Sequence, residues 1–171
     1  QQPTSVCLGT DGKLYVSIQG QPGVTNSGAV LLLQDMKVTP LLSDLQQPGG
    51  VATFREWVYV VDKDRVLRIG GKAMHPLYAA PNTFPTPPKK LHDIVIDPED
   101  GTAYVSDAGG PDGSGAAIYR ITLNGQISRV TDASLLPGLR RPTGLALDGN
   151  AHLLVADSAT GTVYRVKVAS G

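Results

Sequence analysis

One sequence unit recurs four times along this chain. Each copy holds an alternating apolar run, a polar turn and a second apolar run. The copies read PTSVCLGTDGKLYVSI (3–18), PGGVATFREWVYVVD (48–62), LHDIVIDPEDGTAYVSD (91–107) and PTGLALDGNAHLLVAD (142–157). They start 45, 43 and 51 residues apart. This spacing is typical of propeller blades, which repeat every ~40–50 residues and contain four strands each.

The segments between the copies also alternate with a period of two, so units one to three each predict four short strands. An Asn-Gly turn in unit three marks one of the hairpins. We therefore expect an all-β propeller of about four blades in a single domain spanning 1–171. The expected blades cover 3–47, 48–90, 91–141 and 142–171.

The last blade is predicted to be incomplete, because only its first three strands can be read from the sequence. This favours an open arc, and a closed four-bladed ring is the alternative. The last strand, Thr162 to Val168, would carry Val163, Arg165 and Lys167 on one face and Tyr164, Val166 and Val168 on the other. An open arc exposes blade faces, so we expect a homodimer or a contact with further blades.

Aligning the four copies gives one apolar position in each inner strand. These residues are expected to be buried. They are Val6, Val51, Ile94 and Leu145. Small residues at the start of the inner strands (Gly49, Gly50 and Gly144) predict close packing where these strands converge.

Composition excludes two partner classes and leaves the compartment open. Lys+Arg and Asp+Glu both number 15, so charge gives no reason to expect binding to nucleic acid. No apolar run approaches the roughly 18 residues that would span a membrane. The single Cys7 allows no internal disulfide and is expected to be a buried apolar residue. We expect a soluble protein. The start QQPTSV is not a signal peptide and fits the beginning of a mature secreted or periplasmic chain.

The stretch RPTGLALDGNAHLLVADSATGTVYRV resembles an NHL repeat, and LHDIVIDPEDGTAYVSD is similar to a segment of regucalcin-like proteins. The wider superfamily of six-bladed propellers includes regucalcin, the gluconolactonases, strictosidine synthases and paraoxonases. The resemblance implies that this chain supplies about four of six blades. It specifies the fold well and the activity poorly, because propellers carry many functions.

In regucalcin-like lactonases, Glu, Asn and Asp side chains near the starts of inner strands hold a divalent cation such as Ca²⁺, which prefers oxygen ligands. The matching positions here are Thr4, Gly49, His92 with Asp93, and Thr143. Most of them lack the expected carboxylate or amide.

His92, Asp93 and Thr143 are thus the polar candidates in the central channel, and Asp93 with His92 is the candidate metal pair. His92 could serve as a general base oriented by a carboxylate, or as a metal ligand. In the alternative interpretation, His92 only closes the channel and Asp93 accepts hydrogen bonds from nearby backbone amides. His75 and His152 lie in strand patterns and are given no chemistry.

Three further features have structural explanations. Asp62, Asp107 and Asp157 recur at the ends of second strands, where a carboxylate commonly accepts backbone N–H bonds from the following loop. The glycine-rich segment 106–117, which contains Asp112, could wrap a cation or a phosphate but fits a plain hairpin loop. The proline-rich segment 80–90 predicts an extended crossover between blades, with a lid or a partner contact as the alternative.

Two functions follow from these observations. The main expectation is a binding or interaction module that presents loops around a central axis to a small molecule or a protein. The reason is that most positions that would hold a metal ion lack a carboxylate or amide side chain. The alternative is a metal-dependent hydrolase of lactone-like or ester-like molecules of the regucalcin and gluconolactonase type.

Overall fold

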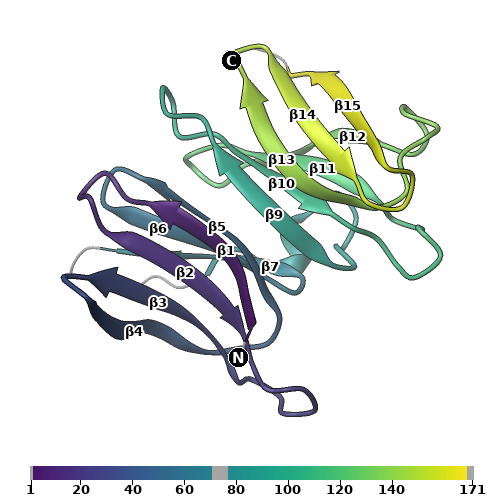
Figure 1. Ribbon diagram of the computed structural model, residues 1–171. Coiled ribbons are helices and arrows are strands. Elements are labelled where there is room, and N and C mark those ends of the chain that lie inside the picture. Colours follow the sequence, from purple (N-terminus) through teal and green to yellow (C-terminus); the bar gives the residue numbers. More distant parts are fainter. Residues whose placement is uncertain (1, 71–76, 169–171) are drawn as a thin grey trace.

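The computed structural model describes residues 2–70 and 77–168 of the chain. Within these residues, fifteen strands form four antiparallel sheets that lie side by side in an open arc (Figure 1). Each sheet follows the order of the chain. The first strands of successive sheets contact one another, so they line the axis of the arc. The predicted all-β propeller architecture is confirmed, and we number its sheets as blades 1 to 4.

Blade 1 consists of β1 (Gln2–Leu8), β2 (Leu14–Gln19), β3 (Gly28–Gln34) and β4 (Lys37–Leu45). Blade 2 consists of β5 (Pro48–Phe54), β6 (Trp57–Asp62), β7 (Arg65–Ile69) and β8 (Leu77–Ala79). Blade 3 consists of β9 (Leu91–Ile96), β10 (Ala103–Asp107), β11 (Ala117–Ile121) and β12 (Ile127–Asp132). Blade 4 consists of β13 (Pro142–Asp148), β14 (His152–Asp157) and β15 (Thr162–Lys167).

Tight turns set the register of the hairpins. Asp35 and Met36, between β3 and β4, both have positive φ angles of 50° and 61°. Positive φ at both central residues is typical of a type I′ turn, whose twist matches that of the two strands it joins. The predicted Asn-Gly turn between β11 and β12 also forms, with Gly125 at a φ of 85° and its N–H donated to the Thr122 carbonyl. Glycine reaches this conformation at no steric cost.

The core lies in three layers, one between each pair of neighbouring blades. Tyr15, Val30 and Val51 belong to the layer between blades 1 and 2. Tyr59, Ile94 and Tyr119 belong to the layer between blades 2 and 3, and a third layer around Ile118 and Leu153 joins blades 3 and 4. Because every blade has two faces, each internal blade contributes to two layers.

The four aligned inner-strand positions have different surroundings. Val51 and Ile94 are buried as predicted, and Leu145 is partly buried against the third layer. The prediction is wrong for Val6, which is 62% exposed. In blades 2 and 3 this position faces the preceding blade, and among the described residues no blade precedes blade 1.

The fourth blade has three strands within the described residues, as the sequence predicted. Blades 1 and 4 lie at opposite ends of the arc (Figure 1), so the closed four-bladed ring does not form. The predicted fourth strand of blade 2 is present only as β8, and its expected first residues, 74–76, lie outside the described part, as does His75.

The crossover from blade 2 to blade 3 packs closely against the molecule. It includes a single 3₁₀ turn, Pro81–Thr83, and places Phe84 in the core, edge-to-face with Tyr119. The Thr86 carbonyl accepts a hydrogen bond from the Tyr119 hydroxyl at 3.2 Å. The described residues contain no helix of the length and apolarity that crossing a membrane requires.

Candidate functional site

The candidate site is a cavity of about 280 Å³ at the axis, where inner strands from all four blades meet. Each blade contributes residues from the start of its inner strand. The wall is formed by Thr4, Ser5, Gln19, Gln47, Pro48, Gly49, Gly50, Lys90, Leu91, His92, Asp93 and Thr143. The three channel candidates from the sequence, His92, Asp93 and Thr143, are therefore brought together in one cavity.

Close packing of inner strands shapes this wall. A Cβ atom added to Gly49 would collide with the His92 carbonyl oxygen, and one added to Gly50 would collide with the Asp93 carboxylate and backbone. Gly144 is different, because its added Cβ would only touch the Ala156 side chain at 3.5 Å. The predicted crowding is thus confirmed between blades 2 and 3. It also leaves no room for a glutamate at position 49.

The imidazole of His92 is held in one orientation. Its Nδ1 lies 2.8 Å from the backbone carbonyl oxygen of Thr143, in the next blade. A carbonyl oxygen can only accept, so Nδ1 carries the proton and donates. In the neutral ring the other nitrogen, Nε2, then holds an unshared lone pair. Because His92 is an exposed residue of the cavity wall, this nitrogen is available as a proton acceptor.

Asp93 connects blade 3 to blade 4. Its Oδ2 accepts the backbone N–H of Leu145 at 2.9 Å, and its Oδ1 accepts the N–H of Ile94 at 2.9 Å. Burial raises the pKa of this carboxyl above its ordinary value, and the two backbone donors partly offset the effect. Ser5 occupies the aligned position in blade 1, and its hydroxyl accepts the Val51 N–H at 3.2 Å. Asp93 and Ser5 therefore each accept a backbone hydrogen bond from the inner strand of the next blade.

Thr4 and Thr143 also engage the backbone. The Thr4 hydroxyl lies 2.9 Å from the Ser17 hydroxyl and donates to the Pro48 carbonyl at 3.1 Å. The Thr143 hydroxyl lies at the limit of hydrogen-bond distance from the Ala156 carbonyl, at 3.5 Å. Among the described residues, neither hydroxyl has a histidine or a carboxylate as a hydrogen-bond partner, which is the partner that activates a nucleophile.

The recurring aspartates fix the chain as it enters each inner strand. Asp107 accepts the backbone N–H groups of Lys89 and Lys90, at 2.9 and 2.8 Å, and that of Gly109 in the following loop at 3.0 Å. The predicted structural role is confirmed, and it extends to the segment before the inner strand. As a result, Asp107 fixes the backbone of Lys90, whose side chain lines the cavity.

Asp62 and Asp157 act in the same way in blades 2 and 4. Asp62 accepts the Gln47 N–H at 2.7 Å and pairs with Arg65. Asp157 accepts the N–H groups of Arg140 and Arg141 and two more from the loop that follows it. Burial raises the pKa of Asp157, but these four backbone donors outweigh it, and the pKa lies below its ordinary value.

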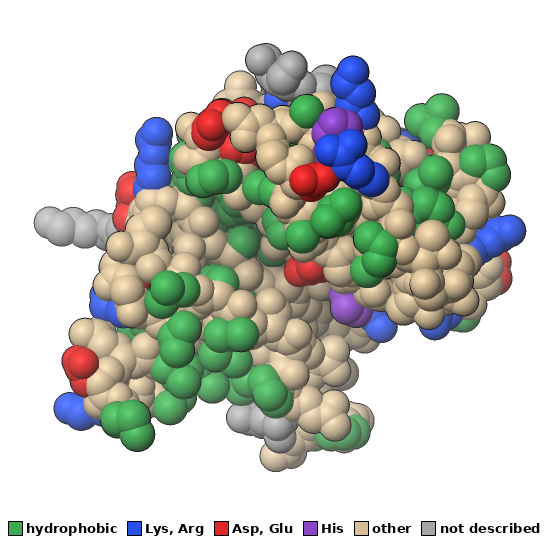
Figure 2. All heavy atoms as spheres, turned by 45° about the horizontal axis from the view of Figure 1, so that its top comes forward, with side chains coloured by type: hydrophobic (Ala, Val, Ile, Leu, Met, Phe, Trp, Pro, Cys, Tyr) green, Lys and Arg blue, Asp and Glu red, His purple; other side chains and the backbone are tan. Residues whose placement is uncertain are grey.

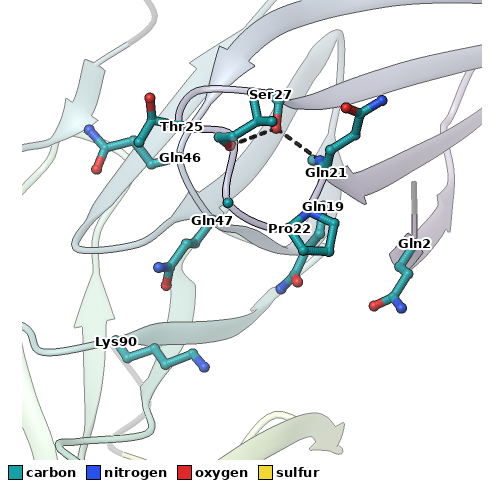
Figure 3. A pocket seen from close by; sticks show the side chains of 12 residues that line it. Gln2, Gln19, Gln21, Pro22, Thr25, Ser27, Gln46, Gln47 and Lys90 are labelled. Atoms are coloured by element: carbon teal, nitrogen blue, oxygen red, sulfur yellow. Dashed lines mark hydrogen bonds between the residues drawn. The ribbon is translucent and has the colours of Figure 1, made fainter.

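A second cavity, of about 480 Å³, adjoins the first and shares Gln19, Gln47 and Lys90 with it. Figure 3 shows glutamine side chains arranged around it, and the amides of Gln19 and Gln47 extend toward the side on which Lys90 lies. The glutamines are Gln2, Gln19, Gln21, Gln46 and Gln47. Each primary amide both donates and accepts hydrogen bonds, and only Lys90 among the lining residues carries a charge.

Sequence reasoning did not single out Lys90 or the glutamines. A signal was present, because Gln46, Gln47 and Lys90 directly precede the inner strands of blades 2 and 3. The glycine-rich loop joins β10 and β11 as a hairpin loop. Within it, Oδ1 of Asp112 accepts the N–H and the hydroxyl of Ser114, at 3.0 and 2.7 Å.

The cavity does not provide a set of metal ligands. Within residues 2–70 and 77–168, no three His, Cys, Asp or Glu side chains come together in a way that could hold an ion. Both Asp93 oxygens already accept backbone N–H groups, and His92 uses Nδ1 on the Thr143 carbonyl. A divalent cation prefers several carboxylate or carbonyl oxygens, so the residues present do not fit one.

No protein-family model and no curated protein sequence matches this chain. Solved structures do resemble it. Regucalcin from Agrobacterium tumefaciens, described as a calcium-binding protein, superposes with a TM-score of 0.68 at 18% identity, over 96% of this chain and 60% of that one. A gluconolactonase from Xanthomonas campestris gives 0.70 at 13% identity, over 98% and 57%.

A luciferin-regenerating enzyme gives a TM-score of 0.67 at 20% identity, over 100% of this chain and 63% of that one. The chain thus spans about three fifths of the length of these structures. At such identities the likeness establishes the fold. The propeller fold that the sequence predicted is confirmed.

Proposed function

We propose that this chain hydrolyses small lactone-type or ester-type molecules in its axial cavity. One observation carries the proposal: His92 is held by the Thr143 carbonyl through Nδ1, which leaves Nε2 as a fixed base in a cavity of about 280 Å³. The fold shared with a gluconolactonase supports the same class of reaction.

The chemistry requires a base and a positive charge near the reacting carbonyl. His92 Nε2 takes a proton from a water molecule, whose oxygen attacks the carbonyl carbon. The acyl C–O bond then breaks and the departing alkoxide oxygen receives the proton, so a lactone gives a hydroxy acid and an ester gives a carboxylic acid and an alcohol. The Lys90 ammonium stabilises the negative charge that develops on the carbonyl oxygen. No step is assigned to a metal ion, because the described residues do not fit one.

Hydrolysis of a panel of small lactones and acetate esters, followed by proton release, tests this proposal. The wild-type chain should turn over at least one of them, and His92→Gln should reduce the rate about 10²–10⁴-fold, the range expected for loss of a general base. Glutamine keeps an N–H for the Thr143 carbonyl, so the orientation contact survives. His152→Gln, in blade 4 and outside the cavity wall, is the matched control and should leave the rate unchanged.

Binding without turnover is the second candidate, and the glutamine-lined cavity favours it. Five amides and one ammonium suit a neutral or anionic ligand with many hydroxyl or carbonyl groups. Isothermal titration with the same lactones and their hydroxy acids distinguishes the two functions. If the wild type binds a ligand without hydrolysing it, and Gln47→Leu weakens this binding, the result would favour a binding module over a hydrolase.

A further inference from the structure

The outer face of blade 1 is apolar across all four of its strands. The pairing register places two rows of residues on this face. One row is Val6, Val16, Leu31 and Pro40, and the other is Leu8, Leu14, Leu33 and Val38. We call these eight residues the blade 1 face. In Figure 2, hydrophobic side chains gather over the lower left of the molecule, where blade 1 lies.

Much of the blade 1 face is open to solvent. Leu8 is 65% exposed, Val38 58% and Leu14 41%. The aligned residues of internal blades are covered: Val51 and Ile94 are 4% and 3% exposed, against 62% for Val6. The blade 1 face is therefore built like the buried faces between blades, and among the described residues nothing packs on it.

The opposite end of the arc is different in character. On the outward face of blade 4, Val163 is 65% exposed, but Arg165 and Lys167 stand beside it on the same strand face. Arg165 pairs there with Asp148, and the row across the sheet from Lys167 contains His152 and Asp148. Charged side chains are rarely buried without partners, so this face is suited to solvent.

We propose that the blade 1 face is the contact surface of a two-fold symmetric dimer of this chain, in which blade 1 of one copy packs on blade 1 of the other. The eight residues carry no charge, so two copies can face each other without repulsion. A two-fold contact covers both faces at once and ends the assembly at two copies. Two apolar sheet faces pack in this way about 10 Å apart.

A head-to-tail contact, with blade 4 of one copy on blade 1 of the next, is less favourable. It would bury Lys167 and the Arg165–Asp148 pair against valine and leucine side chains that offer no further counter-charge, and the lost hydration of buried charges is costly. A two-fold contact between blade 4 faces would bring the same cations of both copies together. The distribution of charge thus favours contact between the blade 1 faces of two copies over contacts that involve blade 4.

The area of the blade 1 face determines how strongly two copies are expected to associate. Four strands at about 4.8 Å spacing and about 3.3 Å per residue give a sheet roughly 19 Å by 20 Å, or about 400 Å². Stable interfaces commonly bury about 800 Å² per partner. A contact of this size predicts a reversible dimer that forms at roughly micromolar to millimolar concentration, not a permanent one.

Sedimentation equilibrium of the chain, from about 1 µM to about 500 µM, tests the proposal. The mass should rise from one copy toward two. Leu8→Lys and Val38→Lys, at the two most exposed apolar positions on strands β1 and β4 of this face, should each shift the midpoint at least tenfold higher. Val163→Lys, equally exposed on blade 4, is the matched control and should leave the midpoint unchanged. Circular dichroism confirms that each variant stays folded.

Three results would overturn the proposal. The first is a wild-type mass of one copy at every concentration. The second is assembly beyond two copies, or an equal effect of Val163→Lys, which would point to head-to-tail contacts. The third is a dimer that both blade 1 variants leave intact. None of these results depends on hydrolysis or ligand binding at the axis, so the two proposals can fail separately.

Discussion

Replacing Val51 and Val6 by alanine, one at a time, measures what a neighbouring blade contributes to stability. The two residues hold the same place in the repeat, but Val51 is 4% exposed and Val6 is 62% exposed. Valine to alanine removes about two methylene equivalents, worth roughly 1.6 kcal/mol when fully buried. The cavity left at Val51 adds to this, for an expected loss of about 2–3 kcal/mol. At Val6 little more than a third of the side chain is buried, so the loss should be about 0.6 kcal/mol.

Both residues lie in inner strands, so the difference in intrinsic strand preference between valine and alanine largely cancels in the comparison. Urea unfolding at low micromolar concentration, where the proposed dimer is dissociated, gives the two free energies of unfolding. For a chain of this size, 1 kcal/mol corresponds to roughly 2–4 °C in Tm, so melting curves should separate the variants by several degrees. Equal losses at the two positions would refute the assignment of Val6 to an uncovered blade face.

The remaining predictions concern single polar groups. The fold lowers the pKa of Asp157, so the stability that this carboxylate contributes is complete above the ordinary carboxyl pKa and is lost as the pH falls through the folded value. Urea midpoints measured between about pH 7 and pH 3 should therefore fall less for Asp157→Asn than for the wild type. Asp93→Ala should lower the free energy of unfolding by about 1–3 kcal/mol, because it leaves the Leu145 N–H without its acceptor. Asp93→Ser should lower it less, because a serine hydroxyl accepts the equivalent N–H at Ser5 in blade 1. Equal losses in urea unfolding would contradict the inter-blade role of this side chain. Calcium at about 5 mM should leave the Tm unchanged, since the described residues offer no ligand set, and a rise would reveal binding by mass action. Burial raises the pKa of Cys7 to about 11, so this thiol should react slowly with a disulfide reagent at about pH 8, and fast reaction in the folded chain would show that its strand opens readily.

The local architecture could be predicted from the sequence because its causes are local. Alternation of apolar residues defines strands whatever lies around them, and the Asn-Gly turn before Gln126 fixes its hairpin through backbone conformation alone. The recurring carboxylates were likewise interpretable, since Asp107 and Asp157 sit where a strand gives way to a loop with free N–H groups. Repetition at blade spacing then implied stacking, because one sheet cannot bury both of its faces.

The candidate site could be predicted only in part. His92, Asp93 and Thr143 were identifiable from their place at the start of inner strands. Their chemistry depends on partners about fifty residues away in sequence: the Thr143 carbonyl fixes the tautomer of His92, and the Leu145 N–H engages Asp93. Backbone partners of this kind leave no trace in residue type, so a carboxylate that fastens two strands looks the same in sequence as a metal ligand.

The strands, their turns and the repeat thus follow from side-chain periodicity and backbone preference, which are encoded locally in the chain. Which of these equivalent units has a neighbouring blade depends on long-range packing and becomes visible in the folded molecule. Val6 and Val51 are both valines in matching patterns, and both faces of blade 1 are apolar. Burial is a property of what packs against a face, and for Val6 nothing among the described residues does.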